Sequence, residues 1–390
     1  MLTSKFERPR LPSYFYVWCE PPDKAGDEVL YVVSERRRIK FKGHSFREFH
    51  QRVIPLLDGR RTMQQIKAEV MDLFAPEDLE AALSLLAAHK LLEDGPEEIA
   101  GSAWSEALRP QLSLFLEVGL KPEQVQQRLK NATVTVLGLG GAGSQVAAGL
   151  AASGVGAIRC ADPLPIAASD VYFSPIFSVG DCGTLRAEVT ARRLSALAPS
   201  LEVSTHIEAL ESDEQVSSLI NGSDFVVCCV DAGQSSLIYR LNRACLKNGT
   251  RWTSCALAGT EVIIGPMVYP FQTACYLCYK MRSVACAGNP EDSFAFEQFL
   301  DRRKRDDSGR RENLVFAAGL AANVLGLEVL KELSGILSTS TRGSIVVVDL
   351  LELSVSRHVV LRKPWCPACF PADQRGGARE GSEPGEQSAN

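Results

Sequence analysis

Four cysteines form two Cys-x-x-Cys pairs, Cys275 with Cys278 and Cys366 with Cys369. Two residues between thiols let both sulfurs bind one ion at a tight turn. Two such pairs make a closed tetrahedral four-thiolate site, which is the arrangement of structural zinc. A redox Cys-x-x-Cys would explain one pair but not both. Because a fully ligated zinc has no open position, we expect a structural Zn²⁺ that holds the C-terminal segment to the fold, without catalysis.

A glycine turn is the second group of candidate residues. It follows the β-branched run 133–137, precedes a helix of small residues, and is followed by a second apolar run that ends on Asp162. This order predicts a βαβ unit of the dinucleotide-binding type. The helix N-terminus would face a phosphate, and Asp162 would take a ribose hydroxyl. The glycines of this turn are Gly138, Gly140, Gly141 and Gly143.

Two further positions are candidates for chemistry. Asp231 is the acid that ends the predicted buried strand 224–231. Cys286 lies in the loop after the first cysteine pair and is a candidate reactive thiol, although no histidine or other base lies near it in sequence. The other cysteines outside the two pairs are predicted to be mostly core residues: Cys19, Cys160, Cys182, Cys228, Cys229, Cys245 and Cys255.

Alternating strands and helices must position these residues. Residues 131–370 read as a doubly wound, mostly parallel α/β sheet of the Rossmann-like type, with a loop of about 20 residues after Asp162. The charge run 301–313 reads as a solvated loop, and residues 371–390 as a disordered tail. The expected strands lie at 203–207, 224–231, 250–256 and 344–350, and the expected helices at 185–197, up to 246, and 314–333.

The N-terminal part has a different pattern. Three strand-like runs, 14–20, 29–34 and 38–42, precede three helices. The first helix is expected to open with a capping box of Ser45 and Glu48, the second with Thr62 and Gln65, and the third near Pro76. Three short strands and three helices predict a winged-helix-like peptide-recognition domain over residues 1–95, with a helical connector over 96–130.

The basic run 36–42 lies on an expected edge strand of that domain. DNA binding is not expected, because the third helix starts with acidic residues that would repel phosphates. Two interpretations remain open: the basic residues guard the edge from unwanted pairing, or the edge accepts a peptide as an added strand. In the second case the peptide contacts would be Arg38, Ile39, Lys40, Phe41, Leu83 and Leu86.

Composition narrows the class of protein. The 390 residues carry a net charge of −5, yet residues 1–62 hold 13 Lys/Arg against 8 Asp/Glu, which favours an acidic partner for that part. No apolar run is long enough to span a membrane, and the start has no signal segment. We therefore expect a cytoplasmic protein without a membrane or nucleic-acid partner, in which the 12 cysteines form no disulfide framework.

With these features in place, residues 131–370 resemble the ThiF/MoeB superfamily of ubiquitin-activating-like adenylating enzymes. The resemblance rests on the run Gly138 to Gly143, Asp162, Asp231 and the paired cysteine motifs. It implies a fold that binds MgATP, with Asp162 at the ribose and Asp231 at the magnesium, and that adenylates a carboxylate. Members are commonly homodimers, so we expect one here.

The segment after Asp162 departs from the superfamily pattern. The family's second acid is Leu164, its Asn is Asp170, its Arg is Phe173 and its Gln is Ser174, while Arg186 replaces the family's Lys. A triphosphate needs cationic clamps on its developing charge. The loss of one cation to Phe173 therefore argues against full adenylation.

A narrower resemblance covers about residues 10–370. The run Leu56 to Ile66 looks like the peptide-recognition winged helix of ribosomal peptide biosynthesis. Four further segments resemble the partner half of azoline-forming cyclodehydratases: 119–122, 264–270, 273–278 and 362–369. That resemblance implies a subunit that binds the leader of a precursor peptide and delivers the core to a YcaO protein. We expect this partner to be a separate protein.

Two alternatives remain. The chain would instead be a working adenylating enzyme that recognises a leader and activates a carboxylate or asparagine, as in microcin-C-type or pantocin-type biosynthesis. Such an enzyme must function with Phe173 in place of a cation. The other alternative is a sulfur-carrier activator that uses Cys286.

Overall fold

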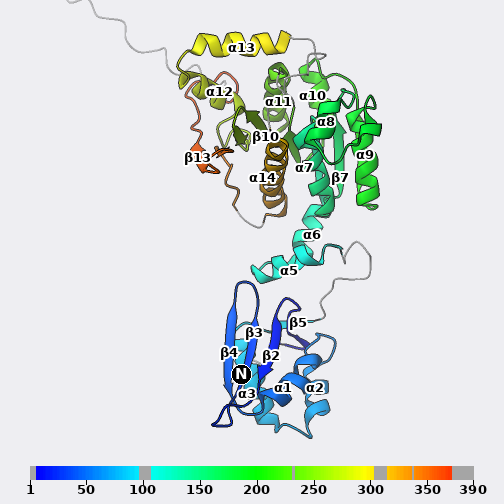
Figure 1. Ribbon diagram of the computed structural model, residues 1–390, viewed down its shortest axis with the longest axis vertical. Coiled ribbons are helices and arrows are strands. Elements are labelled where there is room, and N and C mark those ends of the chain that lie inside the picture. The colour runs from blue at the N-terminus through cyan, green and yellow to red at the C-terminus, as the bar shows by residue number, and fades with distance from the viewer. Residues whose placement is uncertain (1–5, 96–106, 231–232, 303–313, 336–337, 371–390) are drawn as a thin grey trace, which may run out of the picture. The chain divides into compact units, whose positions relative to one another are not determined.

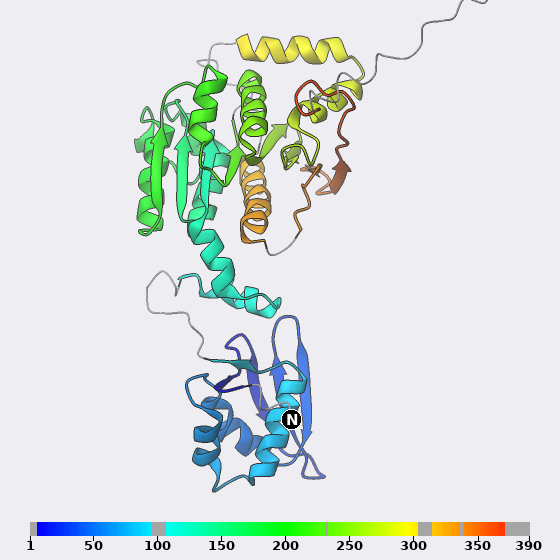
Figure 2. The same cartoon turned by 180° about the vertical axis from the view of Figure 1, so that it is seen from behind.

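The structure is a computed structural model that describes residues 6–95, 107–230, 233–302, 314–335 and 338–370. The chain divides into two units, Met1–Glu123 and Gln124–Asn390, which are described separately. Figures 1 and 2 show both units from opposite sides. None of the helices in these described ranges combines the length and apolarity needed to cross a bilayer.

Unit 1 contains a three-stranded antiparallel sheet in the order β2-β3-β4. The strands are β2 Tyr16–Glu20, β3 Glu28–Val33 and β4 Arg38–Gly43. The short strands β1 Pro9–Arg10 and β5 Glu93–Asp94 pair separately. All three sheet strands lie where the sequence predicts them, and within the described residues β4 is an edge strand.

Helices cover the inner face of this sheet. They are α1 Phe46–Arg52, the short 3-10 turn η2 Ile54–Leu56, α2 Met63–Val70 and α3 Pro76–Ala88. Further along the chain come α5 Arg109–Glu117 and α6 Pro122–Asn131, the second of which spans the boundary between the two units. The predicted capping box of Thr62 and Gln65 is confirmed at α2.

The predicted capping box of Ser45 at α1 is wrong. Ser45 has a left-handed backbone, with φ of 62°, and its side chain makes no capping hydrogen bond. The carboxylate of Glu28 on β3 accepts a hydrogen bond from the Arg47 N–H at 2.8 Å instead. The cap is therefore a tertiary contact, which a local motif does not encode.

Unit 2 is built on an eight-stranded sheet in the order β13-β12-β11-β10-β9-β6-β7-β8. Strands β10, β9, β6, β7 and β8 are parallel to their neighbours, whereas β10 to β13 pair antiparallel. The strands are β6 Thr133–Leu137, β7 Ala157–Ala161, β8 Glu202–His206, β9 Phe225–Cys228, β10 Arg251–Ala258, β11 Glu261–Ile264, β12 Ser344–Asp349 and β13 Val355–Val359.

Helices lie on both faces of this sheet, as a doubly wound fold requires. Helices α7, α8, α9 and α14 pack together on one face, and α10 and α11 pack on the other, with α12 and α13 beside α11. Their bounds are α7 Gly141–Ala152, α8 Ala168–Phe173, the 3-10 turn η3 Val179–Asp181, α9 Arg186–Leu197, α10 Asp213–Ile220, α11 Ser235–Asn248, α12 Tyr276–Ala285, α13 Pro290–Arg302 and α14 Val315–Ser334.

The mostly parallel sheet is confirmed, and β11 and β13 are the two strands that run antiparallel to the others. Two expectations for this unit need correction. The segment after Asp162, expected as a loop, contains α8 and η3. The charge run begins inside α13, which ends at Arg302. Its remainder and the predicted tail lie outside the described residues.

Candidate functional site

The glycine turn lies between β6 and α7, at the point where the sheet order reverses between β6 and β9. Gly138 has a φ of +83°, and a Cβ there would lie 2.6 Å from the Val230 nitrogen. A Cβ at Gly143 would lie 1.8 Å from the Gly138 carbonyl oxygen. Both positions therefore require glycine because backbone approaches backbone.

The other two glycines open α7. Gly140 is its N-cap residue. A Cβ at Gly141 would meet the Phe173 Cβ at 2.8 Å and the Ala318 Cβ at 3.1 Å. The start of α7 is thus covered by α8 and α14, with Phe173 buried against it. Phe173, where the superfamily has Arg, brings an apolar ring to this place and no cation.

Asp162 lies at the end of β7, beside the glycine turn, and is 3% exposed. Its Oδ1 accepts a hydrogen bond from the Leu164 N–H at 2.8 Å. Its Oδ2 accepts one from the Leu139 N–H at 2.8 Å and one from Arg186 Nη1 at 3.2 Å. Each carboxylate oxygen therefore already has a donor from the chain itself.

Arg186 joins Asp162 to a second buried acid. Its Nε and Nη2 donate to the two oxygens of Asp170 at 2.9 and 2.7 Å, which is the bidentate geometry that guanidinium and carboxylate favour. Asp170 is 0% exposed and also accepts from the Ala167 N–H at 2.9 Å, which caps α8. Asp162, Arg186 and Asp170 form a buried charge network, which we call the acid–arginine network.

The carboxylate of Asp162, which the resemblance assigns to a ribose, is already hydrogen-bonded within the chain. A nucleotide ribose at Asp162 would compete with Arg186 and with two backbone N–H groups. The residues present therefore do not fit MgATP in the way the resemblance implies. Asp231, the expected magnesium ligand, lies outside the described residues.

The four paired cysteines come together, as their spacing predicts. All four are buried, and their sulfurs lie within 4.8 Å of one another. The Sγ–Sγ distance is 3.9 Å for Cys275 and Cys278, 3.8 Å for Cys275 and Cys366, and 3.5 Å for Cys278 and Cys369. A tetrahedron with Zn–S bonds of about 2.3 Å has sulfurs about 3.8 Å apart. The cluster therefore has the dimensions of a four-thiolate metal site.

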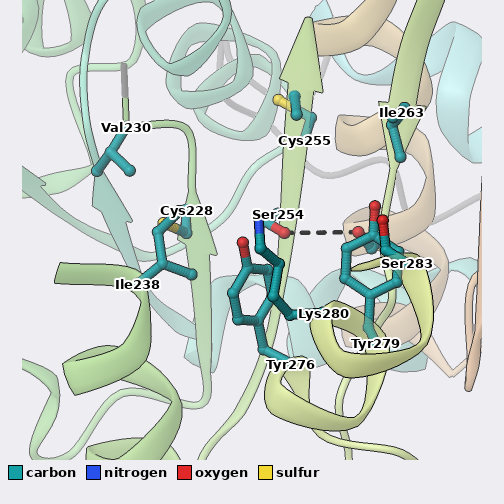
Figure 3. Close-up of a pocket in the computed structure, with 12 residues that line it drawn as sticks. Cys228, Val230, Ile238, Ser254, Cys255, Ile263, Tyr276, Tyr279, Lys280 and Ser283 are labelled. Carbon is teal, nitrogen blue, oxygen red and sulfur yellow. Dashed lines mark hydrogen bonds between the residues drawn. The ribbon is translucent and has the colours of Figure 1, made fainter. Parts of the chain in front are cut away.

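A cavity of about 180 Å³ lies at the end of β9 and beside the middle of β10. Figure 3 shows Cys228 and Val230 on one side of it and Ile263 on the other, with Tyr276 and Lys280 of α12 between them. Lys280 pairs with Glu297 of α13 at 2.7 Å. The sequence carries a signal for this wall, because Tyr276 lies inside the first cysteine pair and Tyr279 and Lys280 follow it three and four residues later, which is helical spacing.

Burial holds three of the groups around this cavity in their protonated form. Burial raises the pKa of the Cys228 thiol to about 12, so it stays protonated at neutral pH. Burial likewise raises the pKa of Tyr276 and of Tyr279. Cys286, the candidate reactive thiol, is exposed and is the C-cap residue of α12, at the start of the loop that leads to α13.

The expected peptide contacts of unit 1 divide into two groups. On β4, Arg38 and Lys40 are exposed, Ile39 is half-buried, and Phe41 is 7% exposed. On α3, Leu83 and Leu86 are 0% and 2% exposed, because they form the core beneath the sheet. These two leucines cannot touch a surface peptide. The accessible leucine of α3 is Leu85, which is 39% exposed.

Known proteins share this architecture. The sulfur carrier protein ThiS adenylyltransferase of Escherichia coli is 23% identical over 245 residues, which covers 63% of this chain and 88% of that protein. The vegetative HesA protein of Trichormus variabilis is 26% identical over 248 residues, covering 63% and 84%.

Solved structures match a larger share of the chain. E. coli MccB with ATP superimposes with a TM-score of 0.66 at 19% identity, covering 93% of this chain and 99% of that one. PaaA superimposes with a TM-score of 0.63 at 17% identity, covering 90% and 99%. At such identity these likenesses concern the fold. The profile of the ThiF family matches residues 111–368, well over half of the sequence, and the chain therefore belongs to the ThiF family.

Proposed function

We propose that this chain is a leader-binding subunit of ribosomal peptide biosynthesis that does not adenylate its peptide. It binds the leader of a precursor peptide through unit 1 and presents the core to a separate YcaO cyclodehydratase. That partner carries the ATP chemistry and closes thiazoline or oxazoline rings.

One observation carries the non-adenylating part of this proposal. Arg186 pairs with both Asp162 and Asp170 in the buried acid–arginine network. In this arrangement Arg186 neutralises Asp162, the carboxylate that would otherwise bind a ribose. Phe173 supplies no cation that could bind a triphosphate. The ThiF-type unit then serves as a scaffold.

The peptide-binding part is supported by the edge of unit 1. β4 pairs with β3 on one side, and among the described residues no strand pairs with its other side. An unpaired strand edge supplies main-chain hydrogen bonds to an extended peptide. Structures of MccB with MccA bound provide a parallel in this fold.

Two structural properties complete the proposal. The metal held by Cys275, Cys278, Cys366 and Cys369 is a structural Zn²⁺, because the four thiolates leave no open coordination position. When bound, it joins the segment after β13 to the start of α12. We also propose a homodimer, as is common in the superfamily.

Reconstitution tests the function directly. The purified chain is combined with ATP, a YcaO cyclodehydratase and a precursor peptide that carries a leader. Mass spectrometry should show the loss of one water per ring only when this chain is present. The proposal fails if the YcaO protein modifies the precursor equally well without it, or if this chain binds no leader.

The second candidate function is an active adenylating enzyme. The likeness to MccB over 93% of the chain, including unit 1, favours it. Pyrophosphate exchange with the same precursor separates the two functions. Exchange well above a no-peptide control would establish adenylation and reject the scaffold, whereas its absence together with ring formation supports the scaffold. A sulfur-carrier activator would instead exchange pyrophosphate with a sulfur-carrier protein.

A further inference from the structure

The backbone of β4 presents alternate residues to its open edge. Ser34 N–H donates to the Arg37 carbonyl at 2.8 Å, so these two residues form a hydrogen-bonded pair at the end of the β3–β4 hairpin. Along an antiparallel ladder such pairs alternate with non-bonded ones. Since Arg38, Lys40 and Lys42 lie opposite Val33, Tyr31 and Val29 in this register, their N–H and C=O groups point to the open edge.

The side chains of the same three residues share the outer face of the sheet. Arg38, Lys40 and Lys42 are exposed, whereas Ile39 and Phe41 turn toward the core. An added strand continues this alternation. Peptide residues opposite Arg38 and Lys40 therefore reach the outer face, and the residue between them reaches the inner face.

Only two of the three cations are available to a peptide carboxylate. Lys42 is bound between Asp23 and Asp27, with both Nζ–O distances 3.0 Å. Its surroundings therefore carry a net negative charge. Arg38 and Lys40 have no carboxylate within 4.0 Å among the described residues. An acid opposite Lys42 would be repelled by the two aspartates, whereas acids opposite Arg38 and Lys40 would be attracted.

The inner side of the same edge is apolar. The ring of Phe41 packs edge-on against His89, the residue that ends α3, at 5.3 Å. Arg37 donates to the carbonyls of His89 and Lys90, which holds the end of α3 beside β4. Leu85 lies one helical turn before His89 and is exposed. An aliphatic side chain on the inner face of an added strand would lie near Ile39 and this end of α3.

From these observations we propose that the leader is recognised through an acid–aliphatic–acid pattern. Two carboxylates at positions i and i+2 face Arg38 and Lys40, and the aliphatic residue between them faces Ile39. This inference rests on the proposed leader binding at β4. It adds the register and the class of peptide: an acidic, extended segment with alternating apolar residues.

Two fluorescent peptides of identical composition test the pattern by anisotropy with the full chain. One carries Glu-Leu-Glu-Leu and the other Glu-Glu-Leu-Leu, each between the same Thr-Ser flanks. The alternating peptide should bind roughly five-fold more tightly, because the blocked isomer loses one cross-strand charge pair and places an acid on the inner face. Equal affinity would overturn the proposal, as would binding of neither peptide.

Two matched variants test whether the cation of Lys40 contributes to binding of the alternating peptide. Lys40→Gln should weaken binding of the alternating peptide roughly two- to five-fold at low salt, and Lys42→Gln should have a smaller effect because Lys42 is already paired. Equal effects of the two variants would overturn the pattern.

Lys40→Pro separates this inference from the proposed function beneath it. Proline is tolerated on an edge strand when its missing N–H faces outward, as it does at Lys40. This variant should lose roughly ten-fold more affinity than Lys40→Gln, because it removes a main-chain donor to the peptide. If it binds like Lys40→Gln, strand addition at β4 is rejected together with the pattern. If it loses binding while the two peptides bind equally, strand addition stands and only the pattern is rejected.

Discussion

Replacing Arg186 with methionine tests whether the acid–arginine network is structural. Methionine keeps much of the length and the apolar stem of arginine but removes all five N–H donors. In the variant, Asp162 and Asp170 lose the cation that links them, although Asp162 keeps its bonds from the Leu139 and Leu164 N–H groups. The two acids would then be buried without a countercharge.

The expected cost follows from burial. Removal of one partner from a buried ion pair costs about 3–5 kcal/mol, because the remaining charge stays uncompensated. Arg186 makes two strong hydrogen bonds to Asp170, at 2.7 and 2.9 Å, and a longer one to Asp162. We therefore expect Arg186→Met to lower the unfolding free energy of unit 2 by about 3–5 kcal/mol, a large share of the roughly 5–15 kcal/mol typical of a domain.

Urea unfolding followed by circular dichroism measures this change, and the same helix offers a matched control. Arg192, also on α9, pairs with Asp181 at 3.1 Å but lies mostly in solvent. Arg192→Met should leave the unfolding free energy close to that of the original chain, because Arg192 is mostly exposed and Asp181 keeps Arg193 and Ser178 as partners. The difference between the two variants isolates the effect of burial.

An Arg186→Met variant as stable as Arg192→Met would refute the network as a structural element. Arg186 would then be replaceable, and the argument that it permanently occupies the ribose carboxylate would fail. A fluorescent ATP analogue gives a second readout. The original chain should bind it weakly, if at all, and tight binding that a competing unlabelled ATP reverses would contradict the non-adenylating proposal.

Three further predictions follow. Gly141→Ala should destabilise unit 2 by about 1–3 kcal/mol through overpacking against Phe173, whereas Gly149→Ala on the same helix, where a Cβ meets nothing within 4 Å, should be neutral or stabilising in thermal unfolding. Elemental analysis should find one zinc per chain, and Cys366→Ser should unfold or aggregate the protein; a zinc-free, stable preparation would contradict the site. Asp162→Asn should leave leader affinity nearly unchanged in anisotropy, and a large loss in a folded variant would place leader binding at the ThiF-type site.

The parallel half of unit 2 could be predicted from the sequence because its signals are local. A β-branched strand, a glycine turn, a small-residue helix and a second strand follow one another within 30 residues, and β6, α7 and β7 confirm that order. In the antiparallel half, the strand predicted at 344–350 is β12, whereas β11 and β13 had no prediction. β13 is exposed along its whole length and so shows no alternation, and β11 is only 4 residues long. A two-residue turn at 259–260, with Gly259 at φ of +61°, was the available signal for the β10–β11 hairpin.

The candidate sites also fall into those that local motifs predict and those that depend on tertiary packing. The cysteine cluster was predictable because the spacing within each pair encodes a local turn and the ion requires both pairs. The acid–arginine network was not, although the departures at Asp170, Phe173 and Arg186 were evident in the sequence. Arg186 contacts both Asp162 and Asp170 because of the way α8 and α9 are placed in the fold. No sequence motif encodes that placement. Leu83 and Leu86 illustrate the opposite error, because an apolar helix face predicts the core at least as well as it predicts a peptide contact.

The glycine turn is required by packing, independently of any nucleotide. Side chains at Gly138 and Gly143 would collide with backbone at Cys229, at Val230 and within the turn itself, whether or not a phosphate is bound. Gly141 is required by contacts with Phe173 and Ala318. The fingerprint is thus a packing requirement of this crossover in its own right, and its presence carries little information about ATP. The cation at Arg186 and its partners are more informative, because a nucleotide would have to displace them.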